Sequence, residues 1–132
     1  MNTKLIMSIS ALVVGGSGIV LSFAPELLLE GMDIPVTGSA TLLFQVMGGL
    51  YLGFGMLNWM AKAGLIGGIY NRPLVIANFT HFLVVALALI KVLTSQQDMP
   101  LVVWVAGLLY GVFALLFGII MFRHPLKAES KD

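Results

Sequence analysis

Four long apolar stretches dominate the sequence and restrict the fold more than any other feature. They cover residues 5–23, 40–61, 73–93 and 100–122, and short polar segments separate them. Each has about the 20 residues that an α-helix needs to cross the hydrocarbon core of a membrane. A transmembrane β-barrel would instead show shorter segments of alternating polarity. We therefore expect an all-α integral membrane protein in which four transmembrane helices form one bundle.

The composition excludes several classes of soluble protein. Hydrophobic residues make up 59% of the chain and charged residues only 10%, against about 25% charged in an average soluble protein. So few charges cannot cover the large relative surface of a small soluble domain. The net charge of +1 offers no basic surface to a nucleic acid. The chain has no cysteine, which excludes disulfides and thiolate metal sites.

The whole chain, residues 1–132, is predicted to be one transmembrane domain that ends in a polar cytoplasmic tail at residues 123–132. Proline positions support the helix boundaries, because Pro73 and Pro100 begin the third and fourth stretches and Pro25 follows the first. No proline lies inside a stretch, where it would remove a backbone hydrogen bond. The first stretch partly resembles a signal peptide, but it is long for one and Pro25 would follow the cut directly. We interpret it as a retained helix.

The distribution of charge predicts the orientation in the membrane. Six of the seven basic residues fall on one side of a four-helix topology: Lys4, Lys62, Arg72, Arg123, Lys127 and Lys131. The first connection carries acids and no basic residue. By the positive-inside rule, both termini are then cytoplasmic and the chain crosses the membrane four times.

The first connection, residues 25–39, allows two interpretations. It places Leu27, Leu28 and Leu29 between Glu26 and Glu30. Such a segment could form a short amphipathic helix in the outer membrane interface. It could equally be a loop whose leucines cover the end of the bundle.

Glycine is frequent, with fifteen residues, and much of it lies in the predicted helices. Gly49 and Gly53 form a GxxxG motif in the second stretch, and Gly107 and Gly111 form another in the fourth. Small residues allow transmembrane helices to approach closely. We expect these four glycines to pack against other helices of the chain, with a subunit interface as the alternative.

Five polar side chains inside the predicted helices are candidate ligand-binding residues: Tyr51, Asn58, Asn78, His81 and Tyr110. Helical periodicity places Asn78 and His81 on one face, and Tyr51 and Asn58 on one stripe. Tyr51, His81 and Tyr110 also fall near the same depth. Polar groups are costly in hydrocarbon, so these residues should face the protein interior.

His81 has the widest chemical range of the five. It could bind the polar head of a lipophilic ligand, relay a proton or ligate a metal. Alternatively, it could be a neutral histidine that donates to a carbonyl or to a tyrosine, with Tyr51 and Tyr110 best placed by depth, and that fixes two helices together. The only other histidine, His124, lies in the tail, so we expect no metal site, and no pattern in the sequence indicates a catalytic residue.

The second and third stretches resemble a known group of proteins. The segment FQVMGGLYLGFGMLNW at residues 44–59, followed by NRPL at residues 71–74 and an apolar helix, is similar to the small bacterial four-helix membrane proteins of the DoxX-like group. The resemblance covers about half of the chain and implies a four-helix bundle in a bacterial inner membrane. Members of the wider group are linked to respiratory or redox complexes, and the resemblance supplies no catalytic motif.

Three functions are compatible with these features. The first is a non-enzymatic subunit, scaffold or binder of a hydrophobic molecule, with membrane lipids and a further copy or a membrane complex as partners. The second is a redox or lipid-processing component that holds a quinone or a lipid head near Tyr51, His81 and Tyr110. The third is a small transporter or channel that works as an oligomer. We expect the first, with no resident cofactor.

Overall fold

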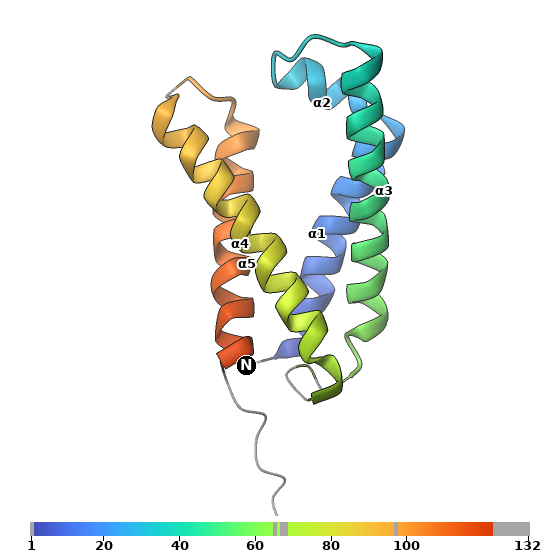
Figure 1. Ribbon diagram of the computed structural model, residues 1–132, viewed down its shortest axis with the longest axis vertical. Coiled ribbons are helices and arrows are strands. Elements are labelled where there is room, and N and C mark those ends of the chain that lie inside the picture. The colour runs from blue at the N-terminus through green and yellow to red at the C-terminus, as the bar shows by residue number, and fades with distance from the viewer. Residues whose placement is uncertain (1, 65, 67–68, 97, 123–132) are drawn as a thin grey trace, which may run out of the picture.

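The computed structural model describes residues 2–64, 66, 69–96 and 98–122, which are helical apart from short connections. Its elements are α1 (Thr3–Phe23), α2 (Pro25–Gly31), α3 (Gly38–Ala61), the 3-10 helix η1 (Ile69–Asn71), α4 (Arg72–Ser95) and α5 (Leu101–Phe122) (Figure 1). The four long helices confirm the four membrane-length stretches, and they begin and end within two residues of the expected bounds. The predicted tail at residues 123–132 lies outside the described residues.

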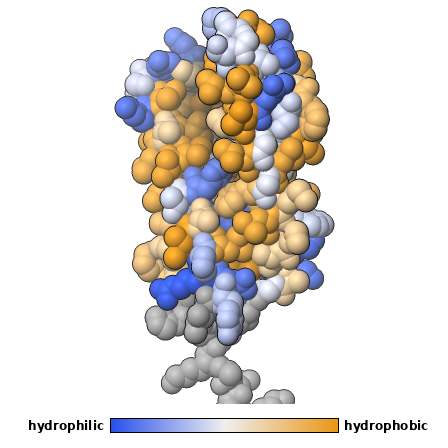
Figure 2. Space-filling view, turned by 45° about the vertical axis from the view of Figure 1, so that its right-hand side comes forward, coloured by the Kyte–Doolittle hydropathy of each residue, from blue (hydrophilic) through white to orange (hydrophobic). Residues whose placement is uncertain are grey.

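Four helices are long and apolar enough to cross a membrane: α1, α3, α4 and α5. At a rise of 1.5 Å per residue, even the 21 residues of α1 span about 32 Å, which matches a hydrocarbon core of about 30 Å. Large apolar side chains are exposed along all four, such as Leu12, Leu50, Leu87 and Leu115. Figure 2 shows this apolar belt, with hydrophilic side chains gathered above and below it. The chain is therefore a multi-pass membrane protein.

Capping residues fix where the helices begin. Asn2 Oδ1 accepts a hydrogen bond from Leu5 N at 3.1 Å before α1, and Thr37 Oγ1 accepts one from Ala40 N at 3.2 Å before α3. Each satisfies a backbone N–H that has no partner within its own helix. Pro73 lies in the first turn of α4, where its missing N–H costs nothing.

The connection between the first two long helices contains a helix, and its leucines also pack against the protein. α2 spans seven residues, Leu29 is fully buried and Leu27 is exposed. The chain leaves α2 through Asp33, which has a φ of 57°. The segment therefore contains the helix of the first interpretation, and α2 also packs against α1 and α3, as the second interpretation expected of the leucines.

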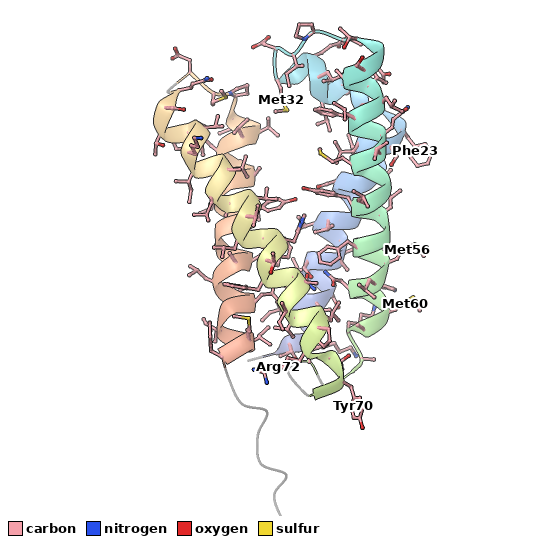
Figure 3. All side chains as sticks on the ribbon, in the orientation of Figure 1. Phe23, Met32, Met56, Met60, Tyr70 and Arg72 are labelled. Atoms are coloured by element: carbon pink, nitrogen blue, oxygen red, sulfur yellow. The ribbon has the colours of Figure 1, made fainter. Side chains whose placement is uncertain are left out.

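The long helices pair as two hairpins. α1, α2 and α3 form the first hairpin, and α4 and α5 form the second. We call the end of the molecule that carries Lys4, Lys62 and Arg72 the basic end, and the end with Glu26, Glu30, Asp33 and Asp98 the acidic end. The hairpins lie close together toward the basic end and diverge toward α2 at the acidic end (Figure 1). Tyr70 and Arg72 mark the basic end in Figure 3.

Glycines let α1 and α3 approach closely, but they are not the predicted ones. A Cβ added to Gly55 would lie 2.7 Å from Gly15 Cα, and one added to Gly18 would lie 2.6 Å from Leu52 N. Gly48 likewise faces the backbone of α1. These contacts are closer than real Cβ atoms allow, so any side chain there would push the helices apart.

The expectation for Gly49 and Gly53 is wrong within the single chain, because nothing lies within 4 Å of a Cβ added at either position. Gly48 and Gly55 are seven residues apart and share the face of α3 that meets α1, which turns Gly49 and Gly53 outward. In α5, Gly107 faces α4 as expected, because a Cβ added there would lie 3.0 Å from Leu93 Cδ1. Gly111 has open space beside it, so the expectation that Gly111 packs against another helix is wrong within the single chain.

Aromatic rings fill the centre of the second hairpin and its contact with the first. Phe82 of α4 stacks on Phe113 and Phe117 of α5, with ring centroids 4.8 Å and 5.5 Å apart. Phe82 and Phe117 are fully buried. Met7 and Val14 of α1 belong to the same core. This core supports the polar residues that lie between the hairpins.

Candidate functional site between the two hairpins

Two buried asparagines join the hairpins. Asn58 of α3 and Asn78 of α4 exchange reciprocal hydrogen bonds: Asn58 Nδ2 donates to Asn78 Oδ1 at 2.7 Å, and Asn78 Nδ2 donates to Asn58 Oδ1 at 2.8 Å. Asn58 Nδ2 also donates to Ser10 Oγ of α1 at 3.3 Å, and Asn78 Nδ2 donates to the Leu74 carbonyl oxygen at 3.0 Å. All three side chains are fully buried. We call Ser10, Asn58 and Asn78 the amide junction.

The amide junction uses all of its side-chain N–H groups within the protein. Each asparagine amide has two N–H donors, and each donor has a partner in the junction or in its own helix. The Ser10 hydroxyl in turn donates to the Met7 carbonyl oxygen at 2.9 Å. This saturation favours a structural role for Asn58 and Asn78 over ligand binding, because an unpaired amide in hydrocarbon would be costly.

A second polar contact lies about two helical turns along α3 from Asn58. Tyr110 Oη of α5 donates to Tyr51 Oη of α3 at 3.0 Å. Tyr110 is buried and Tyr51 is half-buried. A phenol hydroxyl can both accept and donate, so Tyr51 retains a proton for a further partner. The two tyrosines link the hairpins, and the Tyr51 hydroxyl beside His81 can still donate one hydrogen bond.

His81 lies between the hairpins, as expected from its face of the helix. Its ring packs edge-on against Tyr51 and Phe54 of α3, with centroids 5.2 Å apart in both cases. It also contacts Tyr110 of α5 at 5.7 Å. Tyr51, His81 and Tyr110 therefore meet at one level, as their common depth suggested.

The hydrogen bond expected between His81 and Tyr51 or Tyr110 is absent from the described structure. His81 Nε2 is buried and has no hydrogen-bond partner. The physical reason is geometric: the two tyrosine hydroxyls bond each other, and both rings meet the imidazole through their edges or faces. A buried polar atom without a partner is uncommon in folded proteins and indicates strain or a missing ligand.

A cavity of about 290 Å³ lies beside His81. It is lined by Leu50, Tyr51 and Phe54 of α3 and by Ala77 and His81 of α4. Leu50 and Ala77 are exposed, so the cavity opens on the surface that faces lipid between the two hairpins. Two of the five candidate residues, Tyr51 and His81, line this cavity, whereas Asn58, Asn78 and Tyr110 do not.

Sequence reasoning missed two members of this region. Ser10 was not recognised because serine often satisfies itself on its own helix, yet it lies about as far from the basic end as Asn58 and Asn78 do. Phe54 was overlooked as one apolar residue among many, although it lies one turn from Tyr51 on the same face of α3. Equal depth was the signal for Ser10, and helical spacing was the signal for Phe54.

Comparison of the chain with protein-family models, curated proteins and solved structures finds no match. In the part of the chain that the structure describes, no three His, Cys, Asp or Glu residues gather in a way that could hold a metal ion.

Proposed function

We propose that this multi-pass membrane protein is a non-enzymatic binder of a hydrophobic molecule, which it holds in the cavity between α3 and α4. The observation that carries this proposal is the buried, unpartnered Nε2 of His81 beside a cavity that opens toward lipid. An unpaired polar atom in an apolar site costs free energy, and a ligand that bonds it would recover that cost.

The size and lining of the cavity indicate which part of the molecule it holds. Its 290 Å³ is near the lower end of ligand pockets, which hold roughly 300–1,000 Å³. It suits a polar head or one ring, and the rest of the molecule would extend along the exposed surface of Leu50. His81 Nε2 and the Tyr51 hydroxyl are the polar atoms nearest to such a head. A hydroxyl or carbonyl group matches them, and a small rotation of the imidazole would expose Nε2 to it.

A redox or lipid-processing component is the second candidate. The observation that favours it is the convergence of Tyr51, His81 and Tyr110, because these side chains can exchange protons with a bound quinone or lipid head. This candidate requires the same occupied cavity, together with a chemical change in the bound molecule.

The orientation and membrane are part of the proposal. Lys4, Lys62 and Arg72 share one end of the helices, and the positive-inside rule places that end in the cytoplasm. The N-terminus and the C-terminal end of α5 lie at the same end. We infer an inner-membrane protein with both termini inside. Membership of the DoxX-like group stays a prediction, since no family model matches.

Native mass spectrometry of the protein released from membranes tests the binding function. The wild-type chain is expected to carry a hydrophobic molecule, and His81→Phe is expected to lose it while the helical content stays the same. Ala77→Leu should also displace the molecule, because Ala77 is exposed and lines the cavity. Thr80→Val is the matched control, since Thr80 is exposed on the same helix and does not line the cavity.

Two results would contradict the proposal. One is a wild-type chain that carries no molecule under conditions in which membrane lipids are retained. The other is a molecule that both His81→Phe and Ala77→Leu retain at the wild-type level. If His81→Phe instead lowers the melting temperature and changes no binding, His81 has a packing role only.

A further inference from the structure

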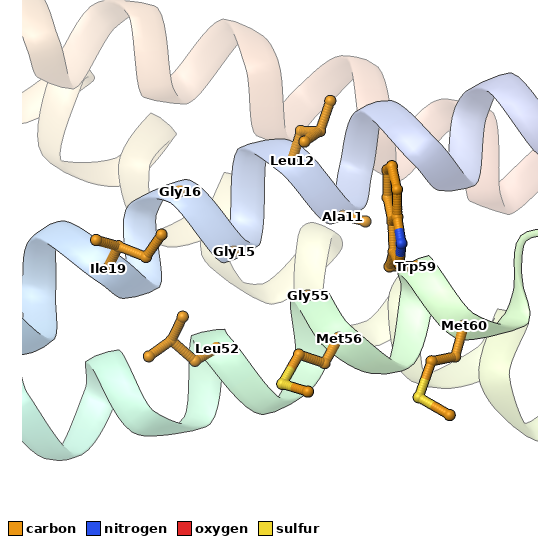
Figure 4. Close-up of a pocket in the computed structure, with 10 residues that line it drawn as sticks. All are labelled: Ala11, Leu12, Gly15, Gly16, Ile19, Leu52, Gly55, Met56, Trp59 and Met60. Atoms are coloured by element: carbon orange, nitrogen blue, oxygen red, sulfur yellow. The ribbon is translucent and has the colours of Figure 1, made fainter.

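A groove of about 360 Å³ follows the surface of the first hairpin and is lined only by α1 and α3 (Figure 4). Its floor is made of small residues, among them Gly15, Gly16 and Gly55. The floor is low because α1 and α3 approach closely here: a Cβ added to Gly55 would lie only 2.7 Å from Gly15 Cα, so Gly55 cannot carry a side chain. Met56 and Met60 stand on one side of it and are 65% and 77% exposed.

The groove has a defined depth in the membrane. It extends from Leu52 to Met60 along α3, a rise of eight residues or about 12 Å. One leaflet contributes about 15 Å of hydrocarbon. α3 ends at Ala61, one residue beyond Met60. The groove therefore covers most of the leaflet at the basic end and stops at the membrane surface there.

A cation lies where the groove ends. Lys62 Nζ is 2.8 Å from the centroid of the Trp59 ring, and Figure 4 shows the Trp59 side chain reaching from α3 toward α1 at that end. The acids in the described part of the chain lie at the opposite end of the helices: Glu26, Glu30, Asp33 and Asp98. Contact with the indole face occupies one side of the ammonium group and leaves the N–H donors on its other side available to an anion.

We propose that the groove binds one acyl chain of an anionic phospholipid, whose phosphate pairs with Lys62. The apolar floor matches an extended hydrocarbon chain, and the cation at its end matches a negatively charged head at the depth of the lipid phosphates. The flexible methionine side chains adapt to the shape of the chain. This site is separate from the cavity at His81 and does not depend on the proposed function.

Charge favours a lipid over a second copy of the protein. A copy packed groove to groove about an axis along the membrane normal would bring its own Lys62 to the same level. Two ammonium groups at one level repel each other, whereas a phosphate neutralises one of them.

Lipid titration of the purified full chain tests the charge requirement. Dioleoyl phosphatidylglycerol and dioleoyl phosphatidylcholine are added separately, and binding is followed by native mass spectrometry. The wild-type chain should prefer the anionic lipid about fivefold, the ratio that corresponds to roughly 1 kcal/mol for one lysine near the surface. Lys62→Gln should abolish this preference. Lys4→Gln is the matched control, because Lys4 lies at the same end but outside the groove.

A second pair of variants tests the groove itself. Gly16→Leu should fill it and reduce binding of both lipids, and Gly53→Leu should not, although both glycines have open space beside them. The proposal is overturned if the two lipids bind the wild-type chain equally, or if Gly16→Leu leaves lipid binding unchanged. A dimer that Gly16→Leu dissociates would assign the groove to a second copy and would also overturn it.

Discussion

Removing one asparagine of the amide junction should destabilise the protein more than removing both. Asn58→Leu deletes two reciprocal hydrogen bonds to Asn78 and the bond to Ser10. Hydrogen bonds between transmembrane helices contribute about 0.6 kcal/mol each, so the two Asn–Asn bonds amount to about 1.2 kcal/mol. The Asn78 amide is also left buried with an unused oxygen and one unused N–H. Such a group costs about 1–3 kcal/mol, which gives a total loss of about 2–4 kcal/mol.

The double variant Asn58→Leu, Asn78→Leu removes that penalty. Both polar groups are replaced by apolar side chains of similar size, which is close to neutral when nothing is left unpaired. We expect a loss of about 1 kcal/mol, less than either single variant. The measurement is the free energy of unfolding in mixed micelles, combined as a double-mutant cycle, and the expected coupling has a magnitude of about 3 kcal/mol or more.

Gln45→Leu is the control for this cycle. Gln45 is an exposed amide on the same helix as Asn58, so its replacement should change the free energy of unfolding by less than about 0.5 kcal/mol. Losses that simply add in the double variant would refute the reasoning, because they would mean that the two amides stabilise the protein independently.

Two further predictions concern packing and topology. Gly55→Leu should lower the free energy of unfolding in detergent by about 1–3 kcal/mol, because its Cβ would meet the backbone at Gly15. Gly53→Leu should have almost no effect, because Gly53 has open space beside it. Equal losses in the two variants would disprove the observed register of α1 and α3. Reporter fusions after Asp132 and at Met32 should give opposite signals, with the cytoplasmic signal after Asp132, and identical signals would refute the four-span topology.

The sequence predicts the length and depth of each helix well, because both follow from hydropathy along the chain. It does not predict which face of a helix meets which neighbour. Gly49 and Gly53 share one face of α3, and Gly48 and Gly55 share another, so spacing alone cannot choose between them. The choice depends on Gly15 and Gly18 of α1, which must oppose glycines for the helices to approach.

The same limit applies to the candidate site. Depth placed Tyr51, His81 and Tyr110 at one level, and the structure brings their rings together. The hydrogen bonds that these side chains then form depend on their rotamers within a packed core. Helical periodicity in the sequence carries no information on rotamers. The pairing of Asn58 with Asn78 could be anticipated from polarity only if the lateral order of the helices were known.

The division into two hairpins also has a consequence for how the protein is made. Synthesis from the N-terminus completes the first hairpin before α4 enters the membrane, and helices of this kind insert before they associate. During that interval Ser10 is the only member of the amide junction available to Asn58. In the nascent chain, the Asn58 amide therefore lies within the bilayer without its main hydrogen-bond partner until Asn78 is inserted. A chain that stalls after α3 would keep this incompletely bonded amide. Membrane chaperones and proteases could use it to distinguish an unfinished protein from a completed one.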